Sequence, residues 1–187
     1  MATEIADWRP TDFDLAGRAR EGDHSAFHEL VDRHAGFLFA VAVSMSGNAA
    51  DAEDLVQETF AGAFRGLAAF EGRASVKTWL TRILVRQAAG RRRSEGRRRA
   101  ALARLEAASQ ADLGQESSDR ATDARVDVAD AMRSLSPEHR EVIALRELQG
   151  LSYDEIAEVL GVPRGTVESR LFRARRRMQE LLKEYFR

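Results

Sequence analysis

The chain has 187 residues, of which 44% are hydrophobic and 32% are charged, and it contains no cysteine. This length accommodates one or two small domains, and the lack of cysteine excludes disulfides, thiolate catalysis and cysteine-based zinc sites. No run approaches the roughly 20 apolar residues that cross a bilayer, and the first ten residues lack the features of a signal peptide. We therefore expect a cytoplasmic protein with no direct membrane insertion.

The net charge of -1 conceals a strong segregation of charge along the sequence. Residues 1–72 carry a net charge of -8, whereas residues 73–104 carry +10 and residues 164–187 carry +5. Residues 105–130 are acidic again, at -5. Two separate basic blocks suit contact with a polyanion, although basic blocks are at least as often plain solvated surfaces.

Apolar residues recur at helical spacing along most of the chain, and no alternating run of strand length occurs, so the predicted fold class is all-α. Helices are expected over residues 23–47, from Asn48 onward and over residues 75–93. Their apolar faces can enclose one core. This places a first domain at residues 10–95.

Beyond this domain, residues 96–126 are expected to form a flexible acidic linker, and residues 127–187 a second small helical domain. Ser152 and Glu155 match the capping box that begins a helix, and Gly161 opens a tight turn before the last helix. Two helices joined by a short turn of this kind predict a helix-turn-helix.

The last helix has an outward face with side chains suited to reading DNA: Ser169, Phe172, Arg173 and Arg176. Arginine and serine can hydrogen-bond base edges, and an aromatic ring can contact a thymine methyl group. The pattern therefore predicts binding in a major groove. The alternative is a solvated surface helix on which Phe172 packs against a neighbour.

The second helix carries an acidic ridge opposite its apolar face, formed by Asp51, Asp54 and Glu58 with Gln57 beside them. Carboxylates can serve acid–base catalysis, but no serine, histidine or glycine-rich loop is placed to complete a catalytic site. A docking surface for a basic partner and a plain solvated face are the remaining interpretations.

Nothing in the sequence predicts a catalytic or metal site. His24 and His28 have the i, i+4 spacing of a metal pair but no clear third ligand, and His34 falls on an apolar face, where a core histidine is expected. No phosphate-binding glycine loop or nucleophile motif occurs. We therefore expect a protein that is not an enzyme and that uses no cofactor or metal.

Four segments together resemble the extracytoplasmic-function sigma factors of the sigma-70 family, which are two-domain initiation factors of bacterial RNA polymerase. The segments are DAEDLVQETF (51–60), FEGRASVKTWL (70–80), LSPEHREVIALR (135–146) and the helix-turn-helix LSYDEIAEVLGVPRGTVESRLFRAR (151–175). The resemblance extends over about residues 13–182 of the chain.

The resemblance implies that the first domain is sigma region two and the second is region four. The core-polymerase-binding residues would then be those of the acidic ridge: Asp51, Asp54, Gln57 and Glu58. The residues that bind and open the minus-ten promoter element would be Phe70, Gly72, Arg73, Ser75, Lys77, Trp79, Arg82 and Arg86. Those at the minus-thirty-five element would be Arg164, Thr166, Glu168, Ser169, Phe172, Arg173 and Arg176.

The implied partners are core RNA polymerase, at its clamp and flap regions, and promoter DNA, with an anti-sigma factor as a further candidate. The linker would thread toward the polymerase active-site cleft. Arg86 and Gly90 stand where the family often has Asn and Asp, and Glu168 stands where a basic residue is usual, so the promoter sequence stays open. Glu168 could accept a hydrogen bond from cytosine or balance neighbouring arginines.

Two other functions compete with this interpretation. One is a stand-alone helix-turn-helix transcription regulator with residues 1–95 as a sensor or dimerisation module, and the other is an adaptor that binds protein through the acidic ridge. A regulator should bind duplex DNA unaided, whereas a sigma factor needs core polymerase. The motif at residues 51–60 favours the sigma factor.

Overall fold

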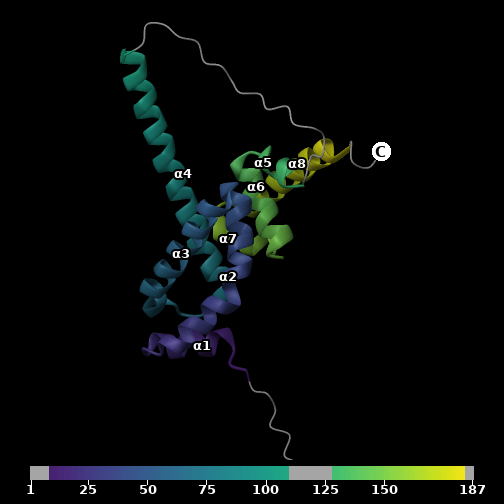
Figure 1. The fold of residues 1–187 in the computed structure, drawn as a ribbon. Coiled ribbons are helices and arrows are strands. Elements are labelled where there is room, and N and C mark those ends of the chain that lie inside the picture. Colours follow the sequence, from purple (N-terminus) through teal and green to yellow (C-terminus); the bar gives the residue numbers. More distant parts are fainter. Residues whose placement is uncertain (1–8, 110–127, 184–187) are drawn as a thin grey trace, which may run out of the picture.

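The computed structural model describes residues 9–109 and 128–183, in which every regular element is a helix (Figure 1). The first half contains α1 (Asp12–Arg20), α2 (His24–Ser46), α3 (Ala49–Gly66), the short turn η1 (Leu67–Ala69) and α4 (Val76–Ser109). The second half contains α5 (Val128–Arg133), α6 (Pro137–Ile143), η2 (Ala144–Leu148), α7 (Tyr153–Leu160) and α8 (Arg164–Leu182). The predicted all-α fold class is confirmed.

The ends of α2 and the start of α3 lie where their capping residues predict. The Asp23 carboxylate accepts hydrogen bonds from two backbone N–H groups at 3.0 and 3.2 Å, and Gly47 ends α2 in the left-handed region at φ 85°. Asn48 then caps α3 by accepting from the Asp51 N–H at 2.8 Å. These bonds satisfy backbone groups that have no partner within the helix.

Helix α1 was not among the predicted elements. It is nine residues long, and its buried face consists of only Leu15, Ala16 and Ala19. So short an apolar stripe gives a weak periodic signal in the sequence. The capping box formed by Thr11 and Asp14 is the sequence signal that could have located it.

Helix α4 continues beyond the predicted end at Arg93 to Ser109, so that predicted boundary was wrong. Leu80, Leu84 and Ala88 face the core in its first half, whereas residues 93–104 are all exposed and project from the molecule (Figure 1). The extension is rich in arginine and alanine, which are strong helix formers, so the helix continues where the apolar pattern stops. The rest of the predicted linker, residues 110–126, lies outside the described residues.

The two halves pack against each other as well as around their own buried side chains. The most buried leucines of the first half are on α1 to α4, and those of the second half are Leu145 and Leu171. Helix α7 contacts α4, while α6 and η2 contact α2. The division into domains at residues 10–95 and 127–187 stays a prediction.

The helix-turn-helix is confirmed in the second half. Ser152 Oγ accepts from the Glu155 N–H at 3.2 Å, and the Glu155 carboxylate accepts from the Ser152 N–H at 2.8 Å, which is the predicted capping box. Gly161 follows α7 at φ 65°, a left-handed conformation that glycine adopts readily. The turn then brings α8 against α7, with Val167 and Leu171 buried between them.

His34 lies in the core, as predicted, with 6% of its surface exposed. Its Nε2 is 2.7 Å from Asp12 Oδ2, and its ring meets Phe37 edge-on. Burial lowers the pKa of His34 from its ordinary 6.5, although the Asp12 carboxylate opposes the change, and Arg33 and Lys77 add to the lowering. The folded chain therefore favours the neutral ring.

We predict that the chain loses stability as the pH falls below about 6.5, the ordinary pKa of histidine. Because the pKa of His34 is lower in the folded state, the unfolded chain takes up the proton first, so this contribution is complete above the ordinary pKa and is lost as the pH falls through the folded pKa. Urea unfolding over about pH 7.5 to 5 measures it, and His34→Gln is the control. An equal pH slope in both chains would contradict the prediction.

Candidate functional site

The acidic ridge is an exposed surface on α3, as the helical pattern predicts. Asp51, Asp54, Gln57 and Glu58 are all exposed, and the opposite side of the helix buries Leu55 and Thr59. Asp54 and Gln57 form no hydrogen bond or ion pair with any described residue, although the Asp54 carboxylate lies near enough to Arg91 to help raise its pKa. A partner can therefore bind these two side chains without displacing an internal hydrogen bond or ion pair.

The remainder of the ridge is tied to α4 by an arginine that the sequence interpretation did not single out. Arg91 donates to the two carboxylate oxygens of Glu58 at 2.6 and 3.1 Å and reaches the Asp51 backbone oxygen at 3.5 Å. The hydrogen bond to Glu58 raises the pKa of Arg91. Sequence alone gives no signal for this pair, because the two residues are 33 positions apart.

The loop between η1 and α4 is held by aromatic packing. Phe70 is only 8% exposed and packs on Trp79 with 4.7 Å between ring centroids, so it faces the core side of the loop. Gly72 has φ 71°, and a Cβ there would lie 2.3 Å from the Phe13 ring of α1. Phe13, which the sequence interpretation did not select, is 64% exposed and its ring could turn aside, so the left-handed backbone at Gly72 is the stronger reason for glycine at this position.

A pocket of about 390 Å³ lies between this loop and the first turns of α4. It gathers six of the eight residues expected at the minus-ten element, together with one residue of α7, Glu158. The six are Phe70, Gly72, Arg73, Trp79, Arg82 and Arg86.

The other two expected residues lie outside the pocket. Ser75 caps α4, its Oγ accepting from the Thr78 N–H at 3.1 Å. Lys77 points toward the second half of the chain and donates to the Gln149 backbone oxygen at 2.7 Å. Arg82, although it lines the pocket, also pairs with the second half, with 2.5 Å between its NH2 and Glu158 Oε1.

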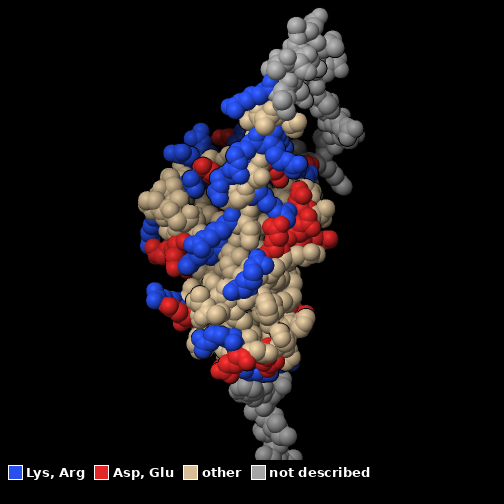
Figure 2. Space-filling view, turned by 90° about the vertical axis from the view of Figure 1, so that its left-hand side faces the viewer, with Lys and Arg blue, Asp and Glu red and all other residues tan. Residues whose placement is uncertain are grey.

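The projecting part of α4 adds a basic surface beyond these residues. Figure 2, which faces this side of the molecule, shows lysine and arginine gathered along its upper part with acidic clusters at the flanks. The exposed arginines of this stretch are Arg93, Arg97, Arg98, Arg99 and Arg104. Such a density of positive charge suits a polyphosphate backbone.

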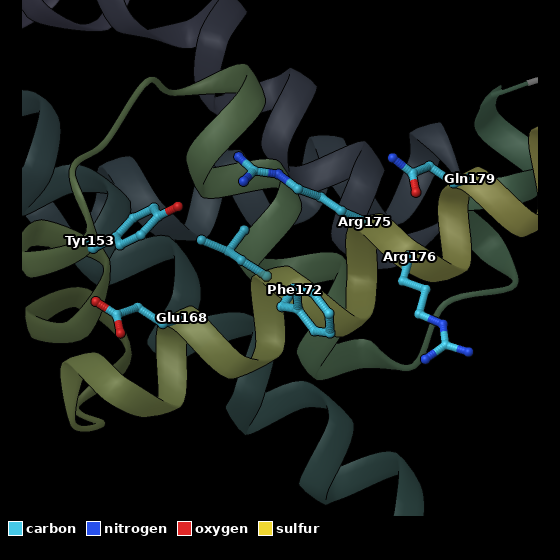
Figure 3. A pocket seen from close by; sticks show the side chains of 7 residues that line it. Tyr153, Glu168, Phe172, Arg175, Arg176 and Gln179 are labelled. Carbon is cyan, nitrogen blue, oxygen red and sulfur yellow. The ribbon is translucent and has the colours of Figure 1, made fainter.

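Helix α8 presents the predicted reading face to solvent. Phe172 is 69% exposed, so the alternative in which it packs on a neighbour is wrong. Glu168, Phe172 and Arg176 follow one another along this helix (Figure 3). They form part of a shallow groove of about 550 Å³ lined by Tyr153, Glu168, Leu171, Phe172, Arg175, Arg176 and Gln179.

The other residues expected on α8 are not part of the lining of this groove. Arg173 is exposed, and Ser169 is half-buried, donating from its Oγ to the Thr166 backbone oxygen at 3.0 Å. Arg164 pairs with Glu168 at 3.0 Å and with Asp154 at 2.9 Å. In the free chain Glu168 thus balances a neighbouring arginine, and a surface pair of this kind exchanges partners at little cost.

The described residues contain no group of three or more histidine, cysteine or acidic side chains placed to hold a metal ion. Among the helices described, none has the length and apolar character needed to cross a membrane.

Comparison with known proteins gives matches to both halves. The sigma-70 region 2 family matches residues 30–98, and the sigma-70 region 4 family matches residues 125–178. The chain is 37% identical over 175 residues to the ECF RNA polymerase sigma-E factor of Haemophilus influenzae, covering 88% of this chain and 92% of the relative.

Solved structures agree with these matches. The chain is similar to the sigma factor RpoE, solved with the anti-sigma factor NepR from Bartonella quintana, with a TM-score of 0.68, 32% identity and coverage of 84% of this chain and 96% of that one. It is also similar to CnrH, solved with the cytosolic domain of CnrY, with a TM-score of 0.67, 31% identity and coverage of 92% and 97%.

Proposed function

Because the chain belongs to the extracytoplasmic-function group of the sigma-70 family, it is a transcription initiation factor that binds core RNA polymerase and directs it to promoters, and we propose how its residues divide this work. Residues 10–95 act as region two and residues 127–187 as region four. Proteins of this family are initiation factors rather than enzymes, and we propose that this chain has no catalytic activity of its own and acts in the cytoplasm.

The acidic ridge is the docking surface for the polymerase clamp. The observation that carries this proposal is the exposure of Asp54 and Gln57, which form no hydrogen bond or ion pair with any described residue. A basic surface can bind Asp54 without first breaking an internal ion pair, whereas at Glu58 it must displace Arg91.

The loop before α4 and the first turns of that helix hold the opened minus-ten element. Arg73, which is 86% exposed at its side chain, and Arg86 offer charge for the backbone, and the pocket beside Trp79 offers room for an unstacked base. Phe70 supports this loop from the core side.

Helix α8 reads the minus-thirty-five element in the major groove. Its exposed Arg173 and Arg176 suit base edges or phosphates, and Phe172 offers an apolar contact to thymine. Arg164 and Thr166 at the start of the helix are placed for the backbone, because helix N-termini attract phosphate.

An anti-sigma factor is a further proposed partner. The similar sigma factor RpoE was solved in a co-crystal with the anti-sigma factor NepR, and CnrH was solved in complex with the cytosolic domain of CnrY. The acidic linker, which includes residues outside those described, is proposed to enter the polymerase active-site cleft.

We predict that Asp54→Arg weakens binding to core polymerase by about tenfold or more, because like charges placed opposite each other across an interface cost several kcal/mol. Asp32→Arg is the matched control, since Asp32 is also exposed and lies on α2 outside the ridge. Fluorescence titration of core enzyme measures both affinities. Equal affinities of the two variants for core enzyme would indicate that the ridge is a plain solvated surface.

Arg173→Ala is expected to cost about 1–3 kcal/mol of promoter discrimination if Arg173 contacts a base. Arg173→Lys keeps the charge but loses the bidentate geometry, so it should also relax the preference at that position. The readout is initiation by reconstituted holoenzyme on promoters substituted one base pair at a time. Unchanged base preferences in both variants would show that Arg173 does not contact a base.

The free chain should bind promoter duplex weakly and with steep salt dependence, and core polymerase should convert this binding into specific recognition with strand opening. Each half offers few base-reading groups, and docking on polymerase would fix their spacing. Gel shifts and permanganate footprints with and without core enzyme test this. Tight, specific binding by the isolated chain would favour the stand-alone regulator.

A further inference from the structure

A further pocket, of about 460 Å³, lies where the middle of α4 meets the end of α2, the start of α3 and α6 of the second half. Part of its lining is apolar, and the charged part consists of four arginines and two acidic residues: Arg91, Arg92, Arg99, Arg140, Asp51 and Glu95. The lining therefore carries a net positive charge. Apolar walls with a few convergent charged groups are the usual composition of a small-molecule site.

Two of the four arginines already have anionic partners outside the pocket. Arg91 pairs with Glu58, and Arg92 pairs with Glu141, and neither of these carboxylates belongs to the lining. The positive charge available to a ligand must therefore come from the other two arginines.

Arg140 of α6 has hydrogen bonds but no counter-charge among the described residues. All four of its hydrogen bonds go to backbone carbonyl oxygens, those of Met45, Met132, Arg133 and Leu135. A guanidinium group has five N–H donors, so one N–H, on NH1, has no partner among the described residues. The only bond from NH1 is the longest of the four, at 3.5 Å, and it goes to Met45, which lines the pocket.

The charge of Arg140 is also unfavourable where it stands. Partial burial lowers the pKa of Arg140, and the positive charges of Arg92 and Arg133 lower it further. Carbonyl oxygens satisfy the N–H groups but carry no net charge, so they do not balance the guanidinium. A bound anion would supply the missing negative charge.

Arg99 is the second arginine without an anionic partner, and it lies on the other side of the boundary between the halves. Its side chain is exposed on α4 and forms no hydrogen bond or ion pair with any described residue. The acidic residues of the lining do not neutralise it, because Glu95 forms no ion pair in the described chain and the Asp51 carboxylate accepts from Asn48 Nδ2.

We propose that this pocket binds a small molecule that carries a diphosphate group, with Arg99 and Arg140 as its ligands. Guanidinium groups bind phosphate oxygens through two parallel N–H donors, and they do so most strongly where water is partly excluded. The two free cations stand on different helices, so an anion with two phosphate groups can engage both. This inference goes beyond the proposed function and does not depend on it.

Calorimetric titration of the full chain with inorganic pyrophosphate tests the proposal. Arg99→Gln should weaken binding by about threefold to tenfold, the effect of losing a hydrogen bond to a charged group at an exposed site. Arg97→Gln is the matched control, since Arg97 is also exposed on α4 but does not line the pocket. Equal affinities of these two variants, or binding of sulfate at the same ionic strength as tight as that of pyrophosphate, would overturn the proposal.

A variant of opposite sign strengthens the test. Glu95→Gln removes a carboxylate from the lining and should tighten pyrophosphate binding by about twofold to threefold, because a like charge beside the ligand is lost. Glu53→Gln makes the same change at an exposed site on α3 outside the pocket, and its affinity should equal that of the wild-type chain. Equal affinities of the two glutamine variants would contradict the placement of the ligand.

Thermal unfolding gives a second readout. Residues of α4 and α6 meet only in the folded chain, so pyrophosphate should raise the unfolding midpoint of the wild-type chain and of Arg97→Gln, and raise it less for Arg99→Gln. Arg140→Lys keeps a positive charge but loses the planar fork, so it should also reduce this rise. Circular dichroism checks that each variant folds, and if Arg140→Lys does not, the Arg99 and Glu95 variants decide.

A last arm distinguishes a free diphosphate from a phosphate of nucleic acid. Arg99→Gln and Arg97→Gln should bind a fluorescent duplex of about 12 base pairs in mixed sequence equally, because each removes one exposed charge from the same stretch of α4. A selective loss of duplex binding in Arg99→Gln would assign the pocket to DNA and overturn the proposal. None of these measurements uses polymerase, so failure of the proposed function would be seen separately, in transcription with the wild-type chain.

Discussion

One helix, α4, must serve the core and most of the charged surfaces of the first half at once. Its first half buries Leu80 and Leu84 and so is fixed by the hydrophobic effect, while its outward sides carry the arginines. Because side chains 100° apart along a helix face different neighbours, consecutive arginines can reach different partners. Helix α3, which carries the acidic ridge, and helix α7 of the second half both contact α4, and the face proposed for the minus-ten element lies in part on α4 itself.

Arg91 and Arg92 show this division most clearly. Arg91 holds Glu58 of the ridge, and Arg92 holds Glu141 of α6. Removing water from Glu141 is costly, so this acid depends on its arginine far more than exposed Glu58 does. The arginine that contacts the surface proposed for polymerase and the arginine at the contact between the halves are therefore neighbours on α4, although their carboxylate partners are 49% and 7% exposed at the side chain.

Local chemistry explains what the sequence predicted well. Caps such as Asp23 and Ser152 determine where helices begin, and the apolar stripes determine which faces are buried, so the ridge and the reading face could be predicted from short windows. The end of α4 could not be predicted in this way, because residues of high helix propensity continue beyond the point where the apolar pattern stops. Contacts between distant residues, such as Phe13 over Gly72, left no local signal because they arise only when the helices pack.

The same limit applies to the minus-ten face. The basic charge and the family resemblance identify Lys77 and Arg82 as candidate DNA-binding residues. Their contacts with Gln149 and Glu158 could not be predicted, because these residues meet only in the folded chain. An exposed ion pair contributes about 0.2–1 kcal/mol, so exchanging a carboxylate for a phosphate at Arg82 changes the free energy little. The halves are held together by several such contacts and also by apolar packing, because the buried hydrophobic residues of both halves form one continuous cluster.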